Sequence, residues 1–139
     1  MSDRRLLSSL SIKANPPLLA DLRSWLTAVL QDAGVAEKPC LDIVLAINEA
    51  CMNIIQHGYA GNLNGDIRVE CFLDEDTLVF NVHDDAPKVD PSRCKSRPLE
   101  QIRPGGLGVH FIHETMDWMK FLDNGADVGN ILEMGKKFK

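Results

Sequence analysis

The sequence predicts an α/β fold of the α+β type: a two-layer sandwich with a mixed, largely antiparallel sheet of about five strands and three helices on one face. Two helical segments precede a pair of strand-like segments, and a third helical segment precedes a second pair. Short turns join most neighbouring strands, so hairpins and antiparallel pairing are expected. With 139 residues, one domain spanning residues 1–139 is expected.

The first two predicted elements are a strand and a helix. Residues 6–14 alternate apolar and polar side chains over their second half, as a half-buried strand does. Asn15 is placed to cap the next helix, because the two prolines behind it suit a first helical turn. Apolar residues then recur every three or four positions until Gly34, which ends the helix.

A second helix is expected from Glu37 to His57, with Gly58 as its stop. Apolar residues cover most of its circumference, and this pattern predicts a helix that is buried nearly all round. Glu49 and Asn53 nevertheless lie in its second half. A desolvated carboxylate costs several kcal/mol unless something compensates it, so these two residues need an explanation.

The remaining elements are two hairpins and a third helix. Residues 66–73 and 77–83 form the first predicted hairpin, and the second of these strands alternates with a clear period of two. A helix is expected over 109–117. Residues 118–122 and 129–138 close the chain as the second hairpin.

Residues 86–104 interrupt this regular pattern. They contain four prolines and little periodicity, and such a long connection in a compact domain is usually functional or mobile. Residues 88–104 carry five basic and two acidic residues, a local charge of +3 in a chain whose net charge is −5. We expect this segment to act as a lid over an anionic ligand.

The composition limits the classes of function. A net charge of −5 disfavours direct nucleic-acid binding, and no apolar run is long enough to span a membrane. The four cysteines form no CxxC pair, so buried free thiols in the cytoplasm are expected. His110 and His113 are interpreted as solvated helix residues, and Trp25 and Trp118 as packing residues.

Three groups of residues are candidates for chemistry. Glu49 and Asn53 lie one helical turn apart, either as a solvated stripe or as hard oxygen ligands suited to Mg²⁺. Asp84 ends a strand, where it either starts a polar loop or accepts a hydrogen bond from an exocyclic amine. The segment 105–108, Gly-Gly-Leu-Gly, is either a simple turn or a phosphate site at a helix start.

Taken in order, these segments resemble the Bergerat-type (GHKL) ATP-binding domain of histidine kinases, gyrase and anti-sigma factor serine kinases. The first motif is the helical Asn-Glu-Ala-Cys-Met-Asn at 48–53, continuing to His57. The second is the strand end at 82–87, and the third is the glycine motif at 105–109. The residues of these motifs and the short lid resemble those of the small anti-sigma factor serine/threonine kinases of bacterial partner-switching systems.

The resemblance implies a role for each matching residue. Glu49 would be the general base that polarises a serine hydroxyl, and Asn53 would hold the Mg²⁺ that accompanies ATP. Asp84 would read the adenine amine, and Arg103 would contact the terminal phosphate. The other expected nucleotide-binding residues are His57, Ala86, Gly105, Gly106, Leu107, Gly108, Val109 and Asn130.

Two positions depart from the family pattern. Ala86 stands where a glycine is usual, and strain is expected if its backbone needs a positive φ. Asn130 stands where a threonine is usual, and its amide could replace the hydroxyl near adenine. Both departures concern nucleotide affinity.

The function implied is an ATP-dependent kinase that binds a sigma factor and phosphorylates an anti-anti-sigma antagonist of the STAS type. A homodimer is implied by the resemblance as well. The alternative is a non-catalytic ATP-binding module that sequesters a partner, which would have no need of Glu49 as a base. The catalytic half of a histidine kinase is a third interpretation, and it would require a partner that carries the phosphoacceptor histidine.

Overall fold

A computed structural model describes residues 4–88 and 106–139, with side chains over 4–88 and 109–139. Most of the predicted lid therefore lies outside the described residues, and so do Arg103, Gly105, Cys94 and the side chains of 106–108. The elements follow in the order β1 (Arg5–Lys13), η1 (Pro16–Leu18), α1 (Leu19–Asp32), α2 (Glu37–Asn53), η2 (Ile54–Gly58), β2 (Asp66–Asp74), β3 (Thr77–Asp84), α3 (Gly106–Thr115), β4 (Trp118–Leu122) and β5 (Asn130–Lys137).

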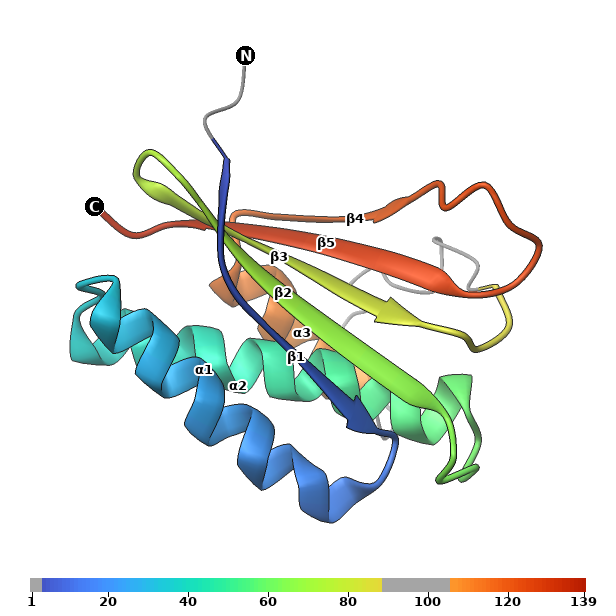
Figure 1. Cartoon of the computed structure of the whole chain (residues 1–139). Helices are drawn as coiled ribbons and strands as arrows, with labels where there is room; N and C mark the ends of the chain where they lie inside the picture. The colour runs from blue at the N-terminus through green and yellow to red at the C-terminus, as the bar shows by residue number, and fades with distance from the viewer. Residues whose placement is uncertain (1–3, 89–105) are drawn as a thin grey trace.

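The five described strands form one sheet in the order β1-β2-β3-β5-β4. Each neighbouring pair is antiparallel. The three α-helices cover one face of this sheet, as Figure 1 shows. The predicted two-layer fold is confirmed, and the pairing described is antiparallel throughout.

The core lies between the sheet and the helices. In β3, every second residue from Leu78 to Val82 belongs to the core between the sheet and the helices, namely Leu78, Phe80 and Val82. On the helix side α2 contributes Ile43 and Ile47, both fully buried. Because side chains alternate across a strand, the next residue in the β3 series, Asp84, faces the same side as the core.

α1 follows the expected pattern with one difference at its start. The prolines form the short η1 turn, for which Asn15 is the N-terminal residue, although its side chain makes no capping hydrogen bond. The buried face of α1 consists of Leu19, Leu22, Leu26 and Leu30. Gly34, with φ of +82°, ends this segment as predicted.

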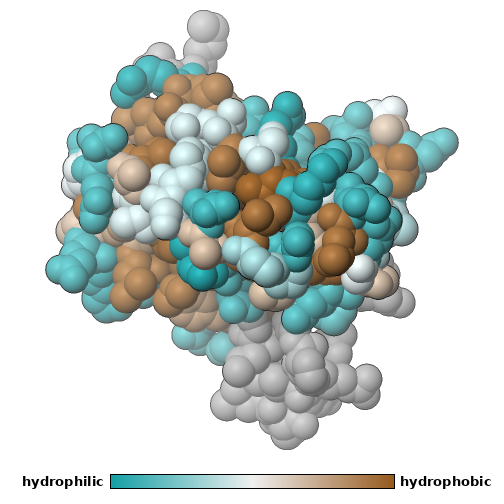
Figure 2. Space-filling model, turned by 60° about the horizontal axis from the view of Figure 1, so that its bottom comes forward, coloured by the Kyte–Doolittle hydropathy of each residue, from teal (hydrophilic) through white to brown (hydrophobic). Residues whose placement is uncertain are grey.

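The prediction that α2 is buried nearly all round is wrong. Leu41 is 57% exposed and Leu45 is 40% exposed, and both lie on the side of α2 that faces away from the sheet. Figure 2 brings the helix-covered side forward and shows apolar patches among polar residues there. The helices form a single layer on the sheet, so the outer side of α2 remains in contact with solvent.

The end of the second helix also differs from the prediction. Residues 54–58 form a π-helical turn, η2, in which the Tyr59 N–H donates to the carbonyl of Ile54 at 2.8 Å. The wider turn changes the angular spacing, so the α-helical stripe from Glu49 and Asn53 does not continue straight to His57. Short π segments are often found at functional sites.

Both tryptophans pack as expected. Trp25 on α1 donates from Nε1 to the Ser8 hydroxyl at 3.0 Å. The Trp118 ring lies on the backbone of Gly135, where an added Cβ would fall 2.2 Å from the ring. No helix among the described residues is long and apolar enough to cross a membrane.

Candidate nucleotide-binding site

Asp84 and Asn130 face each other across β3 and β5 at one end of the sheet. Both are buried, with exposed fractions of 9% and 5%. The Asn130 amide donates from Nδ2 to Asp84 Oδ1 at 3.0 Å and lies at the same distance from the carbonyl of Pro87. The Ala86 backbone N–H donates to the same Asp84 oxygen at 2.9 Å. The carboxylate is thus held in one orientation from two sides.

The turn after Asp84 is hydrogen-bonded to the residue that precedes β5. The Gly129 N–H donates to the Ala86 carbonyl at 2.8 Å. Gly129 has φ of +87°, and a Cβ here would fall 2.8 Å from the Asp84 carbonyl oxygen. Glycine is therefore required at this position by both conformation and space.

Ala86 fits this turn without the expected strain. Among the described residues, the non-glycine residues with positive φ are Ala60 and Glu75, so Ala86 does not have a left-handed backbone. Its side chain is buried, and an added Cβ on Gly58 would lie 3.1 Å from the Ala86 Cβ. The Ala86 side chain therefore packs between the turn after Asp84 and Gly58 of η2.

Burial dominates the electrostatics of this region. It raises the pKa of the Asp84 carboxyl, an effect that the donors from Asn130 and Ala86 oppose. The fully buried Cys51 thiol on α2 has its pKa raised to about 12, first by burial and then by the nearby Asp84 charge. Asp84 therefore lies close to the inner side of α2, near the middle of the first sequence motif.

Tyr59 is a site residue that sequence reasoning did not identify. Its hydroxyl donates to the Asp66 carbonyl at 2.6 Å and accepts from the Asp85 N–H at 2.7 Å. The ring lies against Gly65, where an added Cβ would fall 2.5 Å from it. The sequence signal for Tyr59 was the His-Gly-Tyr run after α2, but only the packing shows that its hydroxyl stabilises the turn after Asp84.

Glu49 and Asn53 are both half-buried on α2, one turn apart, and Asn53 is the last residue of that helix. They lie on the same helix face as Asp42, which is 7 and 11 residues earlier. His57 lies in the π turn with an exposed side chain.

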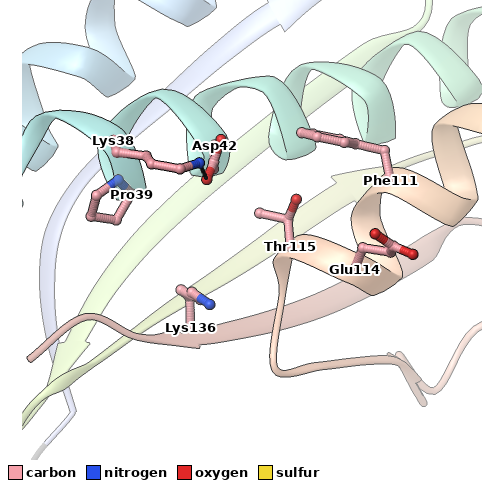
Figure 3. A pocket seen from close by; sticks show the side chains of 7 residues that line it. All are labelled: Lys38, Pro39, Asp42, Phe111, Glu114, Thr115 and Lys136. Carbon is pink, nitrogen blue, oxygen red and sulfur yellow. Dashed lines mark hydrogen bonds and ion pairs between the residues drawn. The ribbon is translucent and has the colours of Figure 1, made fainter.

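α3 runs antiparallel to α2. Figure 3 shows Thr115, near the end of α3, facing Asp42 near the start of α2, with Phe111 lying further along α2. The glycine-rich start of α3 therefore points toward the later part of α2, where Glu49 and Asn53 lie on the face turned to α3. Gly106 and Gly108 belong to the first helical turn, so the helix begins earlier than the predicted Val109. N–H groups in such a turn lack helical acceptors.

The groove in Figure 3 is not the candidate nucleotide site. It has a volume of about 430 Å³ and is lined by both charged and apolar side chains: Lys38, Pro39, Asp42, Phe111, Glu114, Thr115 and Lys136. Nine residues of helix, about 14 Å, separate Asp42 from Cys51, which lies beside Asp84. The groove therefore lies at the opposite end of the α2–α3 contact.

Among the remaining polar candidates, the His110 ring is partly buried, and its Nδ1 has no hydrogen-bond partner among the described residues. His113 is exposed, and His110 is paired through Nε2 with Glu114 at 3.0 Å. Within residues 4–88 and 106–139, no group of three or more His, Cys, Asp and Glu residues is arranged to hold a metal ion. Three cysteines of the described part are buried free thiols: Cys40, Cys51 and Cys71.

The chain was compared with known proteins. The family model described as "Histidine kinase-like ATPase domain" matches residues 12–136. The relatives named "Serine-protein kinase RsbW" include a Listeria monocytogenes protein, 30% identical over 129 residues, that covers 86% of this chain and 82% of its own length. A Bacillus cereus protein of the same name is 31% identical over 128 residues, with 86% and 79% covered.

Solved structures agree on the fold. A crystal structure of the RsbU and RsbW domains of a Mycobacterium tuberculosis protein matches with a TM-score of 0.66 at 19% identity, covering 94% of this chain and 32% of that chain. The Acinetobacter baumannii histidine kinase AdeS matches with a TM-score of 0.54 at 11% identity, covering 96% and 68%. With a family model that spans nearly the whole sequence, the predicted relationship is confirmed, and this chain belongs to the histidine kinase-like ATPase domain family.

Proposed function

We propose that this protein is an ATP-dependent serine/threonine protein kinase. The observation that carries the proposal is Asp84, a buried carboxylate held at the end of β3 by donors from Asn130 and Ala86. A carboxylate accepts hydrogen bonds only, which suits the exocyclic amine of adenine. Membership of an ATPase domain family and relatives named serine-protein kinases support this use of the site.

The proposed phosphate end lies between α2 and α3. The first-turn N–H groups of α3 are donors suited to phosphate oxygens, and Gly106 and Gly108 allow a close approach to that backbone. Asn53 offers one amide oxygen to Mg²⁺, which typically takes few protein ligands and completes its shell with water and phosphate oxygens. Arg103 is the proposed partner of the terminal phosphate, and His57 a further nucleotide contact.

Glu49 is the proposed general base. It shares a helix face with Asn53, so a substrate hydroxyl next to the metal-bound phosphate end would lie within its reach. Bound ATP would supply the phosphoryl group, which would pass to the hydroxyl oxygen while ADP leaves. The protein's own contribution is to orient the hydroxyl, accept its proton at a Glu49 carboxylate oxygen and hold the phosphates in line.

The proposed partners follow from the family resemblance. A sigma factor would be bound, an anti-anti-sigma protein of the STAS type would supply the serine or threonine, and the kinase would act in the cytoplasm as a homodimer. Sedimentation of the purified protein tests the dimer, and mixing with a candidate antagonist tests the substrate.

The test compares Glu49→Gln with Glu37→Gln, an exposed acid in the first turn of the same helix. Both variants and the wild type are incubated with labelled ATP and a candidate antagonist. Loss of the base is expected to reduce transfer roughly 10²- to 10⁴-fold in Glu49→Gln alone, with ATP affinity retained. Equal transfer by Glu49→Gln and the wild type would remove Glu49 as the base. ATP binding without transfer by the wild type would favour the sequestering module.

A further inference from the structure

Two leucines on the outer side of α2 are exposed next to the proposed general base. Leu41 is 57% exposed and Leu45 is 40% exposed. Leu45 precedes Glu49 by one helical turn and Leu41 by two, so they lie about 6 and 12 Å from it along the helix axis. Met52, which is half-buried, follows Glu49 by three positions on the same side of the helix. The proposed base therefore has apolar side chains both before and after it.

We propose that Leu41, Leu45 and Met52, here called the α2 stripe, form the docking surface for the phosphoacceptor protein when its hydroxyl reaches Glu49. This inference rests on the proposed kinase function. It adds the surface by which the kinase would select its substrate. It also gives the chemistry of the partner, which is an apolar patch beside the serine or threonine that receives the phosphoryl group.

The position of Glu49 determines which partner must cover the leucines. A stable protein–protein interface takes about 800 Å² from each partner, which is a patch roughly 30 Å across. A partner centred on Glu49 would extend roughly 15 Å in each direction, and both leucines lie within that distance. Covering them would bury apolar surface, which stabilises the complex, and would exclude water from the reacting hydroxyl.

The polar groups around the α2 stripe are paired, with the exception of Glu49. Lys38 donates to Asp42 at 3.0 Å, as Figure 3 shows, and Arg23 on α1 donates to the amide oxygen of Asn48 at 2.9 Å. Within the part of the chain that the structure describes, the Glu49 carboxylate has no hydrogen-bond or ion-pair partner. A half-buried acid in this state is suited to accept a proton from an incoming hydroxyl. The partner surface should therefore place a hydroxyl opposite Glu49 and apolar groups opposite the leucines.

The test compares Leu41→Ser and Leu45→Ser with two control variants. Leu6→Ser changes a leucine of similar exposure, 50%, on the edge strand β1. Leu45→Met retains an apolar side chain at the proposed surface. The substrate is the STAS-type antagonist that the wild type phosphorylates in the assay described above. Initial rates at several antagonist concentrations and saturating labelled ATP give kcat and KM separately, and ATP affinity is measured for each variant.

The two serine variants on α2 are each expected to raise the KM for the antagonist roughly five- to tenfold, because each removes apolar contact area from the complex. Their kcat and ATP affinity should stay close to those of the wild type, since neither leucine contacts the reacting groups. Leu6→Ser and Leu45→Met should retain the wild-type KM. A folding defect would instead lower kcat and ATP binding together.

Four results would overturn the inference. An unchanged KM in Leu41→Ser and Leu45→Ser would place the docking surface elsewhere, while the kinase function would stand. An equal increase in Leu6→Ser would show that the effect is not specific to α2. Sedimentation of the α2 variants as smaller particles than the wild type would show that a second copy of this chain covers the leucines. A wild type that phosphorylates no STAS-type protein would remove this inference together with the proposed function.

Discussion

Replacing Asp84 by Asn tests the adenine contact directly. The asparagine carbonyl can occupy the Oδ1 position and still accept from Asn130 and Ala86, so the fold is expected to remain intact. The Oδ2 position, however, would become an NH₂ donor facing the adenine amine. Loss of a hydrogen bond to a charged acceptor costs about 1.5–3 kcal/mol, which corresponds to roughly ten- to hundredfold weaker ATP binding.

A fluorescent ATP analogue titrated against the folded variant measures this loss. Asp85→Asn is the matched control, because Asp85 is the adjacent acid and its side chain is exposed. The control is expected to bind ATP as the wild type does. Unchanged affinity in Asp84→Asn would refute the reasoning, since adenine would then be recognised by other groups.

Asp84→Asn is expected to weaken ATP binding, but it is not expected to lower the free energy of unfolding at neutral pH. Because burial raises the pKa of Asp84, the folded state holds this proton more tightly than the unfolded state. The contribution of Asp84 to the unfolding free energy therefore falls as pH rises from the ordinary value of 3.8 through the raised one. Above that window, urea unfolding of Asp84→Asn is expected to show stability equal to or above that of the wild type. A large loss at neutral pH would contradict this sign.

Four further substitutions test the surrounding structure. Gly129→Ala combines a φ of +87° with a contact of 2.8 Å to the Asp84 carbonyl oxygen, and an unfolding free energy lower by about 2–4 kcal/mol is expected. Gly125→Ala, with φ of +70° and open space, should cost only about 1 kcal/mol in the same urea titration. Tyr59→Phe loses two backbone hydrogen bonds, so proteolysis of the turn after β3 should become faster and ATP binding weaker. Leu41→Ser, at a position 57% exposed, should change the thermal midpoint little, and a large drop would show that this leucine is covered.

Strong local patterns in the sequence predicted most of the fold. The alternation through β3 and the glycine at position 34 are local signals, and they predict a strand and a helix end with few competing interpretations. The predicted strand over 118–122 coincides with β4, Trp118–Leu122.

Features that depend on long-range packing were not predicted. Leu41 and Leu45 carry the same hydropathy as core leucines, and only the single helix layer determines that they are exposed. The π turn at 54–58 needs no special residue, so no local signal indicated it. The site was predicted in part: Asp84 and Asn130 lie together, but their mutual hydrogen bond depends on pairing across 46 positions of sequence.

Tyr59 is the only tyrosine in the chain, and its hydroxyl connects the start of β2 with the turn beyond β3. Fluorotyrosine incorporated during expression would therefore give a single fluorine NMR signal from beside the proposed adenine pocket. That signal would report nucleotide arrival, or its absence in a variant, without a fluorescent analogue or an altered side chain elsewhere. One natural residue thus makes this part of the protein directly observable in solution.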